Sequence, residues 1–258
     1  MIEVKALSLA YGKKTVLSDV SLKIPAGSIC SIIGANGCGK STFLKALARR
    51  LTPRNGDILL GGVPLKEYSL PDLALKMAFV PQFFQIPAEI TVEELVALGR
   101  FPHRSFRLTK EDRDAVENAI VSTGVARLRH QRVSALSGGE RQKARIAMAL
   151  AQDAKVLLLD EPVSFLDVGS QFEVVSLLRK LNEEKNTTVV MVLHDVNLAA
   201  RYSDLIFAFC NGRLYRSGTP REIIDENLLR SVFNVDAEVI SGNEELPFCR
   251  IKGVSGTL

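Results

Sequence analysis

Short apolar runs and longer amphipathic stretches alternate along the chain, and their order predicts a mixture of strands and helices. The first sixty residues are rich in β-branched side chains, which favours strands. Four strands are predicted in this part, over residues 2–9, 20–24, 28–33 and 58–60. Apolar positions with helical spacing predict a helix from Lys40 that stops at Pro53. The Asn55–Gly56 pair that follows predicts a tight turn.

The middle of the chain, residues 87–150, has little strand signal and predicts a helical insertion. Residues 91–99 and 109–124 both repeat apolar positions at the spacing of an amphipathic helix. Thr109 and Asp112 form an N-cap pattern at the start of the second helix.

The last hundred residues return to alternating strands and helices. Residues 156–159 and 189–193 are almost wholly apolar, as is typical of strands that are covered on both faces. A helical stripe lies between them, and residues 205–216 predict a hairpin with a type I′ turn at Asn211–Gly212. Because strand, helix and strand follow one another, a largely parallel α/β sheet is predicted.

Composition narrows the class of protein. With 258 residues, 47% hydrophobic and 24% charged, the chain has an ordinary folded composition and the length of one large domain or two small ones. The net charge of +4 is too mild to indicate a nucleic-acid partner, so none is expected. No apolar run approaches the roughly 18–20 residues of a membrane helix.

The four cysteines form no CxxC pair, which excludes metal-ribbon and thioredoxin-type sites. Since the sequence also begins without a signal-peptide pattern, a reducing cytosolic compartment is expected.

A glycine-rich motif predicts a phosphate-binding loop. Residues 34–41 fit G-x-x-x-x-G-K-[ST] at every fixed position, between a predicted strand and a predicted helix. Lys40 is expected to reach the β- and γ-phosphates and the Ser41 hydroxyl to bind Mg²⁺, while main-chain N–H groups point at phosphate oxygens. The alternative is a glycine-rich turn with a chance lysine, and Cys38 is interpreted as an inert filler. The predicted nucleotide-binding residues of this loop are Gly34, Ala35, Asn36, Gly37, Cys38, Gly39, Lys40, Ser41 and Thr42.

Two acids at the end of an apolar run predict a second part of the site. Asp160 and Glu161 follow the strand predicted at 156–159, where ionised groups need a cation or hydrogen-bond donors. Asp160 suits Mg²⁺, and Glu161 is placed to orient or deprotonate a water near the γ-phosphate. The alternative is a strand-end turn with paired charges. Together with the loop, these acids predict a Mg²⁺-dependent nucleoside triphosphatase.

The two motifs do not choose between ATP and GTP. Residues 109–112 fit the guanine-reading T-K-x-D pattern, but they stand at a predicted helix start rather than after a sheet strand. We therefore interpret them as a helix cap.

A third motif lies at another predicted helix start. Ser137 and Glu140 form a capping box, and the glycines between them leave helix N-terminal amides bare for an anion. One nucleotide offers one γ-phosphate, which the loop already holds, so a second anion site implies a second chain. A carboxylate at position 140 repels a neighbouring phosphate unless Arg141 or the helix dipole compensates.

These motifs together resemble the ATP-binding-cassette (ABC) family, over nearly the whole chain to about Asp236. Residues 136–140, LSGGE, are similar to the family signature LSGGQ, with glutamate in the last place. The resemblance implies an α/β fold: a P-loop NTPase core with a mainly parallel sheet, an N-terminal antiparallel β subdomain and an inserted α-helical subdomain. Residues 1–236 are then expected to be a single ATPase domain with its insertion at about 87–150, and residues 237–258 a C-terminal extension.

The resemblance also implies roles for four further positions. Gln82 is similar to the Q-loop glutamine, which senses Mg²⁺ and the membrane partner, and residues 164–167 are similar to the D-loop. His194 resembles the switch histidine, which steadies the γ-phosphate and the attacking water. Tyr11 is placed like the aromatic residue that stacks on adenine, which favours ATP. Without the family, His194 reads as a satisfied strand-end histidine, Tyr11 as a turn residue, and Gln82 carries no information.

A head-to-tail pair of chains is the assembly that the family implies. In such a homodimer Ser137, Gly138 and Gly139 contact the γ-phosphate that Lys40 of the other copy holds. The predicted catalytic residues are then Glu161, His194, Gln82 and Lys40, and the predicted Mg²⁺ ligands are Ser41, Gln82 and Asp160.

Residues 97–103, 137–142 and 194–202 are similar to the ATPases of importers for iron–siderophores, haem and cobalamin. In these importers an extracytoplasmic substrate-binding protein delivers the cargo, two permease subunits form the path and two ATPase subunits drive it. The resemblance therefore implies a peripheral subunit on the cytoplasmic face of the inner membrane.

The permease is expected to dock on the stretch from Gln82 to Arg104. Aromatic and aliphatic side chains gather in this stretch, although about half of them could instead fill the core of the helical insertion. They are Phe83, Phe84, Ile86, Ile90, Phe101 and, just beyond it, Phe106.

Two other classes of function compete with an importer subunit. A soluble ABC ATPase acting on ribosomes or DNA usually carries two cassettes or a long coiled coil, and the sequence has one cassette and no sustained heptads. A regulatory module that holds ATP without turnover finds no support, since Lys40, Gln82, Glu161 and His194 are all present.

Overall fold

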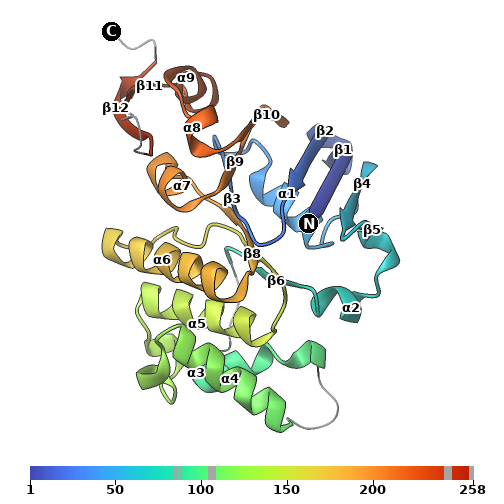
Figure 1. The fold of residues 1–258 in the computed structure, drawn as a ribbon, viewed down its shortest axis with the longest axis vertical. Helices are drawn as coiled ribbons and strands as arrows, with labels where there is room; N and C mark the ends of the chain where they lie inside the picture. Colours follow the sequence, from blue (N-terminus) through green and yellow to red (C-terminus); the bar gives the residue numbers. More distant parts are fainter. Residues whose placement is uncertain (84–86, 88, 104–108, 241–245, 256–258) are drawn as a thin grey trace. The chain divides into compact units, whose positions relative to one another are not determined.

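The computed structural model describes residues 1–83, 87, 89–103, 109–240 and 246–255. The chain forms two compact units, the first comprising Met1–Glu67 with Val190–Leu258 and the second Tyr68–Val189. Strand β8 (Thr188–Val192) begins in the second unit and ends in the first (Figure 1). The predicted single domain over 1–236 with an insertion at 87–150 stays a prediction.

An antiparallel sheet forms the N-terminal part of the first unit, as expected. Its order is β2 (Lys14–Ile24), β1 (Ile2–Tyr11), β4 (Asn55–Leu60) and β5 (Val63–Pro64), followed by the short 3₁₀ turn η1 (Leu65–Glu67). Buried and open positions alternate along parts of β1 and β2, so one face of the sheet packs against the core. The strand predicted at 20–24 begins earlier, because Gly12 and Lys13 make a tight turn that lets β2 pair with β1 from Lys14.

The tight turn predicted at Asn55–Gly56 is wrong. Both residues belong to β4, where the register with β1 is interrupted between Lys5 and Ser8. Gly56 has φ +80°, and an added Cβ would lie 2.3 Å from the Lys5 carbonyl oxygen. Glycine is therefore required by a close approach of two strands, which local sequence does not distinguish from a turn.

Three further strands of the first unit pair with one another. The fully buried β3 (Ile29–Gly34) runs parallel to β9 (Leu205–Cys210), and β10 (Arg213–Gly218) pairs with β9 antiparallel. Positive φ angles at Asn211 and Gly212 confirm the predicted hairpin turn.

Helix α1 (Lys40–Leu47) follows β3, and its Phe43 ring packs on Phe209 with centroids 5.3 Å apart. The helix was expected to continue to Pro53, and that boundary is wrong. It ends at Leu47 because Arg49 takes a left-handed conformation, φ +53°, which a helix cannot propagate.

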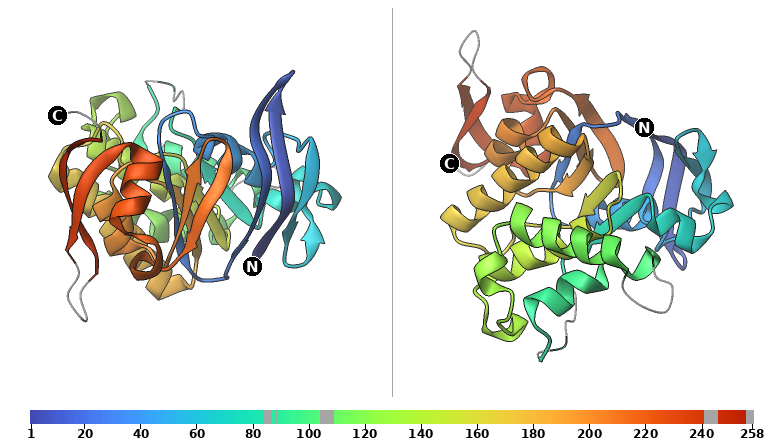
Figure 2. Two further views of the ribbon diagram at one scale, coloured as in Figure 1. Left: turned by 90° about the horizontal axis from the view of Figure 1, so that it is seen from above. Right: turned by 60° about the horizontal axis from the view of Figure 1, so that its bottom comes forward.

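The C-terminal part of the first unit has three helices and a hairpin. They are α7 (Val196–Tyr202), α8 (Pro220–Ile223), α9 (Glu226–Phe233) and the antiparallel pair β11 (Val235–Ile240) and β12 (Phe248–Val254). Figure 2 shows the hairpin beside the helices of this unit.

Asn197 of α7 joins the hairpin to that helix. Its side chain donates from Nδ2 to the Cys249 carbonyl at 3.1 Å and accepts from the Cys249 N–H at 2.7 Å. Burial raises the pKa of the Cys249 thiol to about 11, so the thiol stays protonated while its main chain makes this contact. The hairpin is thus attached to α7 through main-chain groups.

The second unit contains a parallel strand pair and a helical bundle. Strands β6 (Met77–Val80) and β7 (Val156–Leu159) are parallel, with α2 (Leu70–Ala74) before them and α6 (Val168–Lys185) after them. The parallel pairs β3–β9 and β6–β7, with the helical bundle and the N-terminal antiparallel sheet, confirm the predicted α/β fold class.

Three helices form the bundle where the sequence predicts a helical insertion. They are α3 (Val92–Leu98), α4 (Lys110–Ser122) and α5 (Gly138–Ala151), which lie side by side in the right-hand view of Figure 2. Leu95, Ile120 and Ala144 are fully buried between them. Short 3₁₀ turns connect the helices: η2 (Phe101–His103), η3 (Ala126–Leu128) and η4 (Val133–Ala135).

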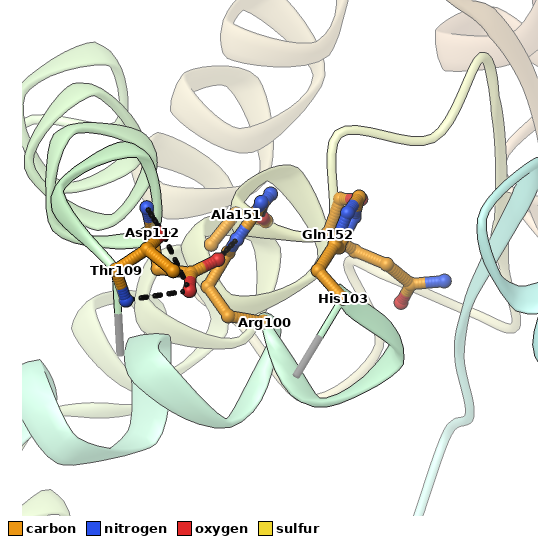
Figure 3. Close-up of polar contacts among 6 residues, drawn as sticks. All are labelled: Arg100, His103, Thr109, Asp112, Ala151 and Gln152. Atoms are coloured by element: carbon orange, nitrogen blue, oxygen red, sulfur yellow. Dashed lines mark hydrogen bonds and ion pairs between the residues drawn. The ribbon is translucent and has the colours of Figure 1, made fainter. Parts of the chain in front are cut away.

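A buried ion pair holds one end of the bundle (Figure 3). Arg100 donates from Nε to Asp112 Oδ1 at 2.8 Å and from Nη1 to the Ala151 carbonyl at 2.8 Å, and its side chain is 9% exposed. Asp112 also accepts from the N–H and hydroxyl of Thr109, which confirms the helix cap. Residues 109–112 therefore serve the bundle, as expected, and not a guanine base.

We expect Asp112→Asn to lower the free energy of unfolding by roughly 3–5 kcal/mol, because it leaves the Arg100 guanidinium buried without its anion. Hydrogen bonds from Thr109, and then the ion pair with Arg100, lower the Asp112 pKa to about 2 from its usual 3.8. The stabilisation is full above pH 3.8 and is lost as the pH falls through 2. Chemical denaturation at pH 7 and pH 2 measures this. The gap between the variant and the parent should be smaller at pH 2 than at pH 7, and an equal gap at both values would contradict this prediction.

Candidate functional site

The predicted phosphate-binding loop lies between β3 and α1, as its motif requires. Residues 35–37 at its tip are exposed, while Gly34 and Lys40 at its base are buried. The N-cap of α1 is Gly39, which has no side chain to accept hydrogen bonds from the first amides of the helix. Those amides, at the positive end of α1, form an anion-binding terminus of the kind the motif predicts.

The side chain of Lys40 turns back into the loop. Its Nζ donates to the carbonyl oxygens of Gly34 at 2.7 Å and Ala35 at 2.9 Å. An added Cβ on Gly34 would lie 2.3 Å from the Phe209 carbonyl oxygen, so only glycine fits where the loop leaves β3. The loop is thus fixed at its base by β9 and across its width by the lysine.

Glu161 is held by two hydrogen-bond donors at the end of β7. Gln82 donates from Nε2 to Glu161 Oε2 at 2.5 Å, and Ser164 donates from its hydroxyl to the same oxygen at 2.8 Å. Glu161 has φ +51°, an uncommon backbone conformation that turns the chain directly after the strand. Asp160 before it is 4% exposed, and its N–H donates to the Val80 carbonyl at 2.9 Å. The structure therefore brings together Gln82 and Glu161, which the sequence separates widely.

Arg145 of α5 forms hydrogen bonds with the main chain at Pro81 and Gln82. It donates from Nη2 to the Pro81 carbonyl and from Nη1 to the Gln82 carbonyl at 3.3 Å. Burial, and then the nearby charge of Arg141, lower the pKa of Arg145 below its usual value. No motif in the sequence pointed to this residue, because its partners are main-chain carbonyl groups far away in the chain.

The signature stretch begins α5 with a complete capping box. The Ser137 hydroxyl accepts from the Glu140 N–H at 3.3 Å and donates to Glu140 Oε2 at 2.9 Å, while Ser137 N–H donates to the same oxygen at 3.0 Å. These contacts lower the Glu140 pKa and direct its carboxylate back to the cap. Ser137 and Gly138 are exposed, so this helix end is accessible.

Two exposed aromatic rings lie beside the Gln82–Glu161 contact. Phe83 is 77% exposed and Phe165 is 86% exposed, and their ring centroids are 6.5 Å apart. Phe165 follows Ser164 with φ +64°, and Asp167 then caps α6 by accepting from the Ser170 N–H at 2.9 Å. This pair forms an apolar surface on the second unit.

The remaining predicted docking residues divide between surface and core. Phe101 is 71% exposed, whereas Ile90 packs partly buried against the bundle core. Phe84, Ile86, Arg104 and Phe106 lie outside the described residues. We define the docking surface below by Phe83, Phe101 and Phe165.

His194 and Tyr11 belong to the first unit and are both open to solvent. His194 follows β8, and Asp195 after it caps α7 by accepting from the N–H groups of Asn197 and Leu198. Tyr11 ends β1 and is 50% exposed. The first unit thus carries the phosphate loop, Tyr11 and His194, and the second carries Gln82, the signature stretch, Asp160 and Glu161.

The donor set fits a nucleoside triphosphate with Mg²⁺. The loop of the first unit offers an ammonium, helix N-terminal amides for phosphate and the Ser41 hydroxyl. The second unit separately offers the Asp160 carboxylate, and hydroxyl and carboxylate oxygens are ligands that Mg²⁺ prefers. Among the described residues no group of three His, Cys, Asp or Glu side chains forms a metal cage. Mg²⁺ needs none, because it is usually held by one or two carboxylates together with substrate phosphates.

Comparison with known proteins gives matches over most of the chain. Residues 17–164 match the family model of the ABC transporter domain. The chain is 45% identical to the petrobactin import ATP-binding protein FpuD of Bacillus anthracis, over 92% of this chain and 88% of that protein. It is 42% identical to the ferric enterobactin transport ATP-binding protein FepC of Escherichia coli K12, over 91% and 87%.

A solved structure matches the fold as well. It is the dimeric ATP-binding cassette MJ0796 in a post-hydrolysis state bound to ADP and phosphate, with a TM-score of 0.75 and 30% identity. The match covers 85% of this chain and 98% of that one. Separately, none of the described helices combines the length and the apolar character needed to cross a bilayer.

Proposed function

Because the chain belongs to the ABC transporter family and is the ATP-binding, ATP-hydrolysing subunit of an import system, we propose that it powers the uptake of a ferric siderophore. The relatives above are named for petrobactin and enterobactin import, which favours this cargo over haem and cobalamin. The alternative of an ATPase acting on ribosomes or DNA is not favoured. Membrane association through a permease follows from membership in an import system.

The observation that carries the catalytic part is the Glu161 carboxylate, held by Gln82 and Ser164 at the end of β7. Two donors on one carboxylate oxygen fix the orientation of the group. A base that is fixed before the reaction needs no reorganisation during it. This arrangement supports Glu161 as the residue that orients and deprotonates the attacking water.

The proposed roles of the other residues follow from their chemistry. Bound ATP with Mg²⁺ supplies the phosphoryl group that is transferred to water. Lys40 and the amides at the start of α1 bind its phosphate oxygens, and Ser41, Gln82 and Asp160 contribute oxygen ligands to the metal. His194 steadies the γ-phosphate, and Tyr11 stacks on the adenine. Catalysis is then mostly positioning and charge stabilisation.

A head-to-tail dimer completes the proposed site. Ser137 and Gly138 form an exposed helix start, a terminus suited to an anion supplied by another chain. The Ser137 hydroxyl then exchanges its bond to Glu140 for one to the γ-phosphate bound by the partner copy. ATP closes the two copies, and hydrolysis lets them reopen.

The permease is proposed to dock on Phe83, Phe101 and Phe165. These rings are 71–86% exposed, and Phe83 follows the glutamine that holds Glu161. Phe83 and Phe165 also lie together, with ring centroids 6.5 Å apart, and exposed aromatic side chains that gather on a surface are typical of protein interfaces. Docking there places the membrane partner next to the catalytic carboxylate of the second unit.

We expect Phe83→Asp to reduce transport by at least about tenfold, because a charge at the centre of an apolar interface costs more than the contact contributes. ATP hydrolysis by the isolated chain should stay within about twofold, since the ring is exposed. Cargo uptake by cells and ATPase rates of the purified chain measure the two. Val121→Asp on α4, 59% exposed and away from this surface, is the control. Equal loss of transport and hydrolysis would show that Phe83 serves the fold.

The cargo is tested with the assembled importer. The chain is reconstituted with its permease and substrate-binding protein, and the binding protein is loaded in turn with ferric enterobactin, a ferric hydroxamate, haem or cyanocobalamin. Stimulation of ATP hydrolysis by either ferric siderophore supports the proposal. Stimulation by haem or cyanocobalamin alone contradicts the cargo, and co-purification with ribosomes or DNA in place of a permease contradicts the importer.

A further inference from the structure

Arg145 connects the helix that begins at the signature stretch with the loop that carries Gln82. It lies about two turns into α5, and its guanidinium donates to the main-chain carbonyls of Pro81 and Gln82. Nη1 also donates to Gln142 Oε1 at 3.2 Å, one turn earlier on the same helix. A planar fork of donors suits two adjacent carbonyl oxygens in a way that a single ammonium does not.

The contact continues from the Gln82 main chain to the catalytic carboxylate. Arg145 fixes the carbonyl side of Gln82, and the Gln82 amide donates to Glu161 Oε2 at 2.5 Å. Two hydrogen-bonded contacts, joined through the covalent structure of Gln82, therefore connect α5 with Glu161. Because the partners of Arg145 are neutral oxygens of Pro81, Gln82 and Gln142, its contribution lies in geometry rather than in an ion pair.

The C-terminal end of α5 is also held by hydrogen bonds, from Arg100 and His103 (Figure 3). Arg100 Nη1 donates to the Ala151 carbonyl, and His103 Nε2 lies 2.8 Å from the Gln152 carbonyl. Gln152 Nε2 in turn donates to the Met77 carbonyl at 3.0 Å, at the start of β6. Because the far end of the helix is held in this way, we expect a displacement at the Ser137 end to reach the contacts of Arg145.

We propose that Arg145 is a positioning residue that ties the Ser137 end of α5 to the orientation of Glu161 through Gln82. The inference rests on the proposed function, in which Ser137 contacts the nucleotide of the partner copy and Glu161 acts on the chain's own. Arg145 thereby couples the two ATP sites of the dimer within one chain. Engagement of Ser137 at one site stabilises the catalytic geometry at the other.

The test uses the purified full-length chain and steady-state ATP hydrolysis over a range of ATP concentrations. Arg145→Met keeps the length of the side chain but removes every donor, and kcat should fall by at least about tenfold with KM within about twofold. The Hill coefficient for ATP should fall toward one, because the two sites no longer communicate. Arg145→Lys restores one donor and should recover part of kcat.

A double variant separates positioning from a general structural role. In a Gln82→Ala background, Arg145→Met should change kcat by less than about twofold further, because both residues act through one contact. Arg179→Gln, which removes a partly exposed arginine paired with Glu183 on α6, is the control and should retain the parent kcat and Hill coefficient.

Three results would overturn the proposal. One is a parent-like kcat and Hill coefficient in Arg145→Met, and another is a fully additive loss in the Gln82→Ala background. The third is a loss that follows a lower melting temperature together with lost ATP binding, which assigns Arg145 to stability alone. Absence of ATP hydrolysis by the unmodified chain would instead contradict the proposed function, so the two failures are distinguishable.

Discussion

Glu161→Gln should slow ATP hydrolysis by about 10²–10⁴-fold while leaving ATP affinity within about twofold, because the amide keeps the shape of the carboxylate but cannot accept a proton. The variant oxygen can still accept from Gln82 Nε2 and the Ser164 hydroxyl, so the local geometry is retained. The ATP-bound variant should also accumulate as a dimer, because closure no longer ends in hydrolysis. Single-turnover hydrolysis and size-exclusion chromatography with ATP and Mg²⁺ measure both effects.

Glu183→Gln is the matched control for this variant. Glu183 is an exposed acid on α6, paired with Arg179, and its replacement should leave hydrolysis unchanged. Normal turnover by Glu161→Gln would remove Glu161 from the role of the base. If Glu161→Gln also lost ATP binding, the substitution would disturb the fold rather than remove the base.

Lys40→Ala should weaken ATP binding by about 100-fold and abolish measurable hydrolysis, because it removes a charged donor to the phosphates. It also removes the donor that joins the Gly34 and Ala35 carbonyls across the loop. Equilibrium titration with a fluorescent ATP analogue, with and without Mg²⁺, measures the affinity.

The control for Lys40→Ala lies on the same helix. Lys45 stands five residues further along α1, in its last turn, and Lys45→Ala removes the same charge away from the loop. Its ATP affinity should match that of the parent. A Lys40→Ala chain that hydrolyses ATP at the parent rate would overturn the assignment of the phosphate loop.

The parts of the site that the sequence predicts are those whose chemistry is contiguous in the chain. The loop from Gly34 to Ser41 needs its glycines, lysine and hydroxyl at fixed short spacings, so the pattern itself specifies the structure. The capping boxes at Thr109 and Ser137 are local for the same reason, and both are present as predicted. The roles of these residues toward nucleotide and metal remain predictions for the experiments above.

The features that the sequence does not reveal depend on contacts between distant residues. Arg145 meets the Pro81 and Gln82 carbonyls across more than sixty positions, and main-chain acceptors leave no pattern in side chains. At Gly56 a local signal was misleading. The Asn–Gly pair predicted a turn, but the close approach of a neighbouring strand determines the backbone there. Arg49 ended α1 early through one left-handed residue that helix propensity does not foresee.

The two hydrogen bonds between the Asn197 side chain and the Cys249 main chain affect which substitutions the C-terminal hairpin can accept. The amide of Asn197 pairs with the N–H and carbonyl of Cys249 as a neighbouring strand would, so any residue except proline at position 249 can present the same two groups. The attachment therefore depends on main-chain groups of β12 rather than on the thiol of Cys249, although that side chain is buried. Shortening the chain before β12 would release the turn that follows His194 from its partner in the hairpin.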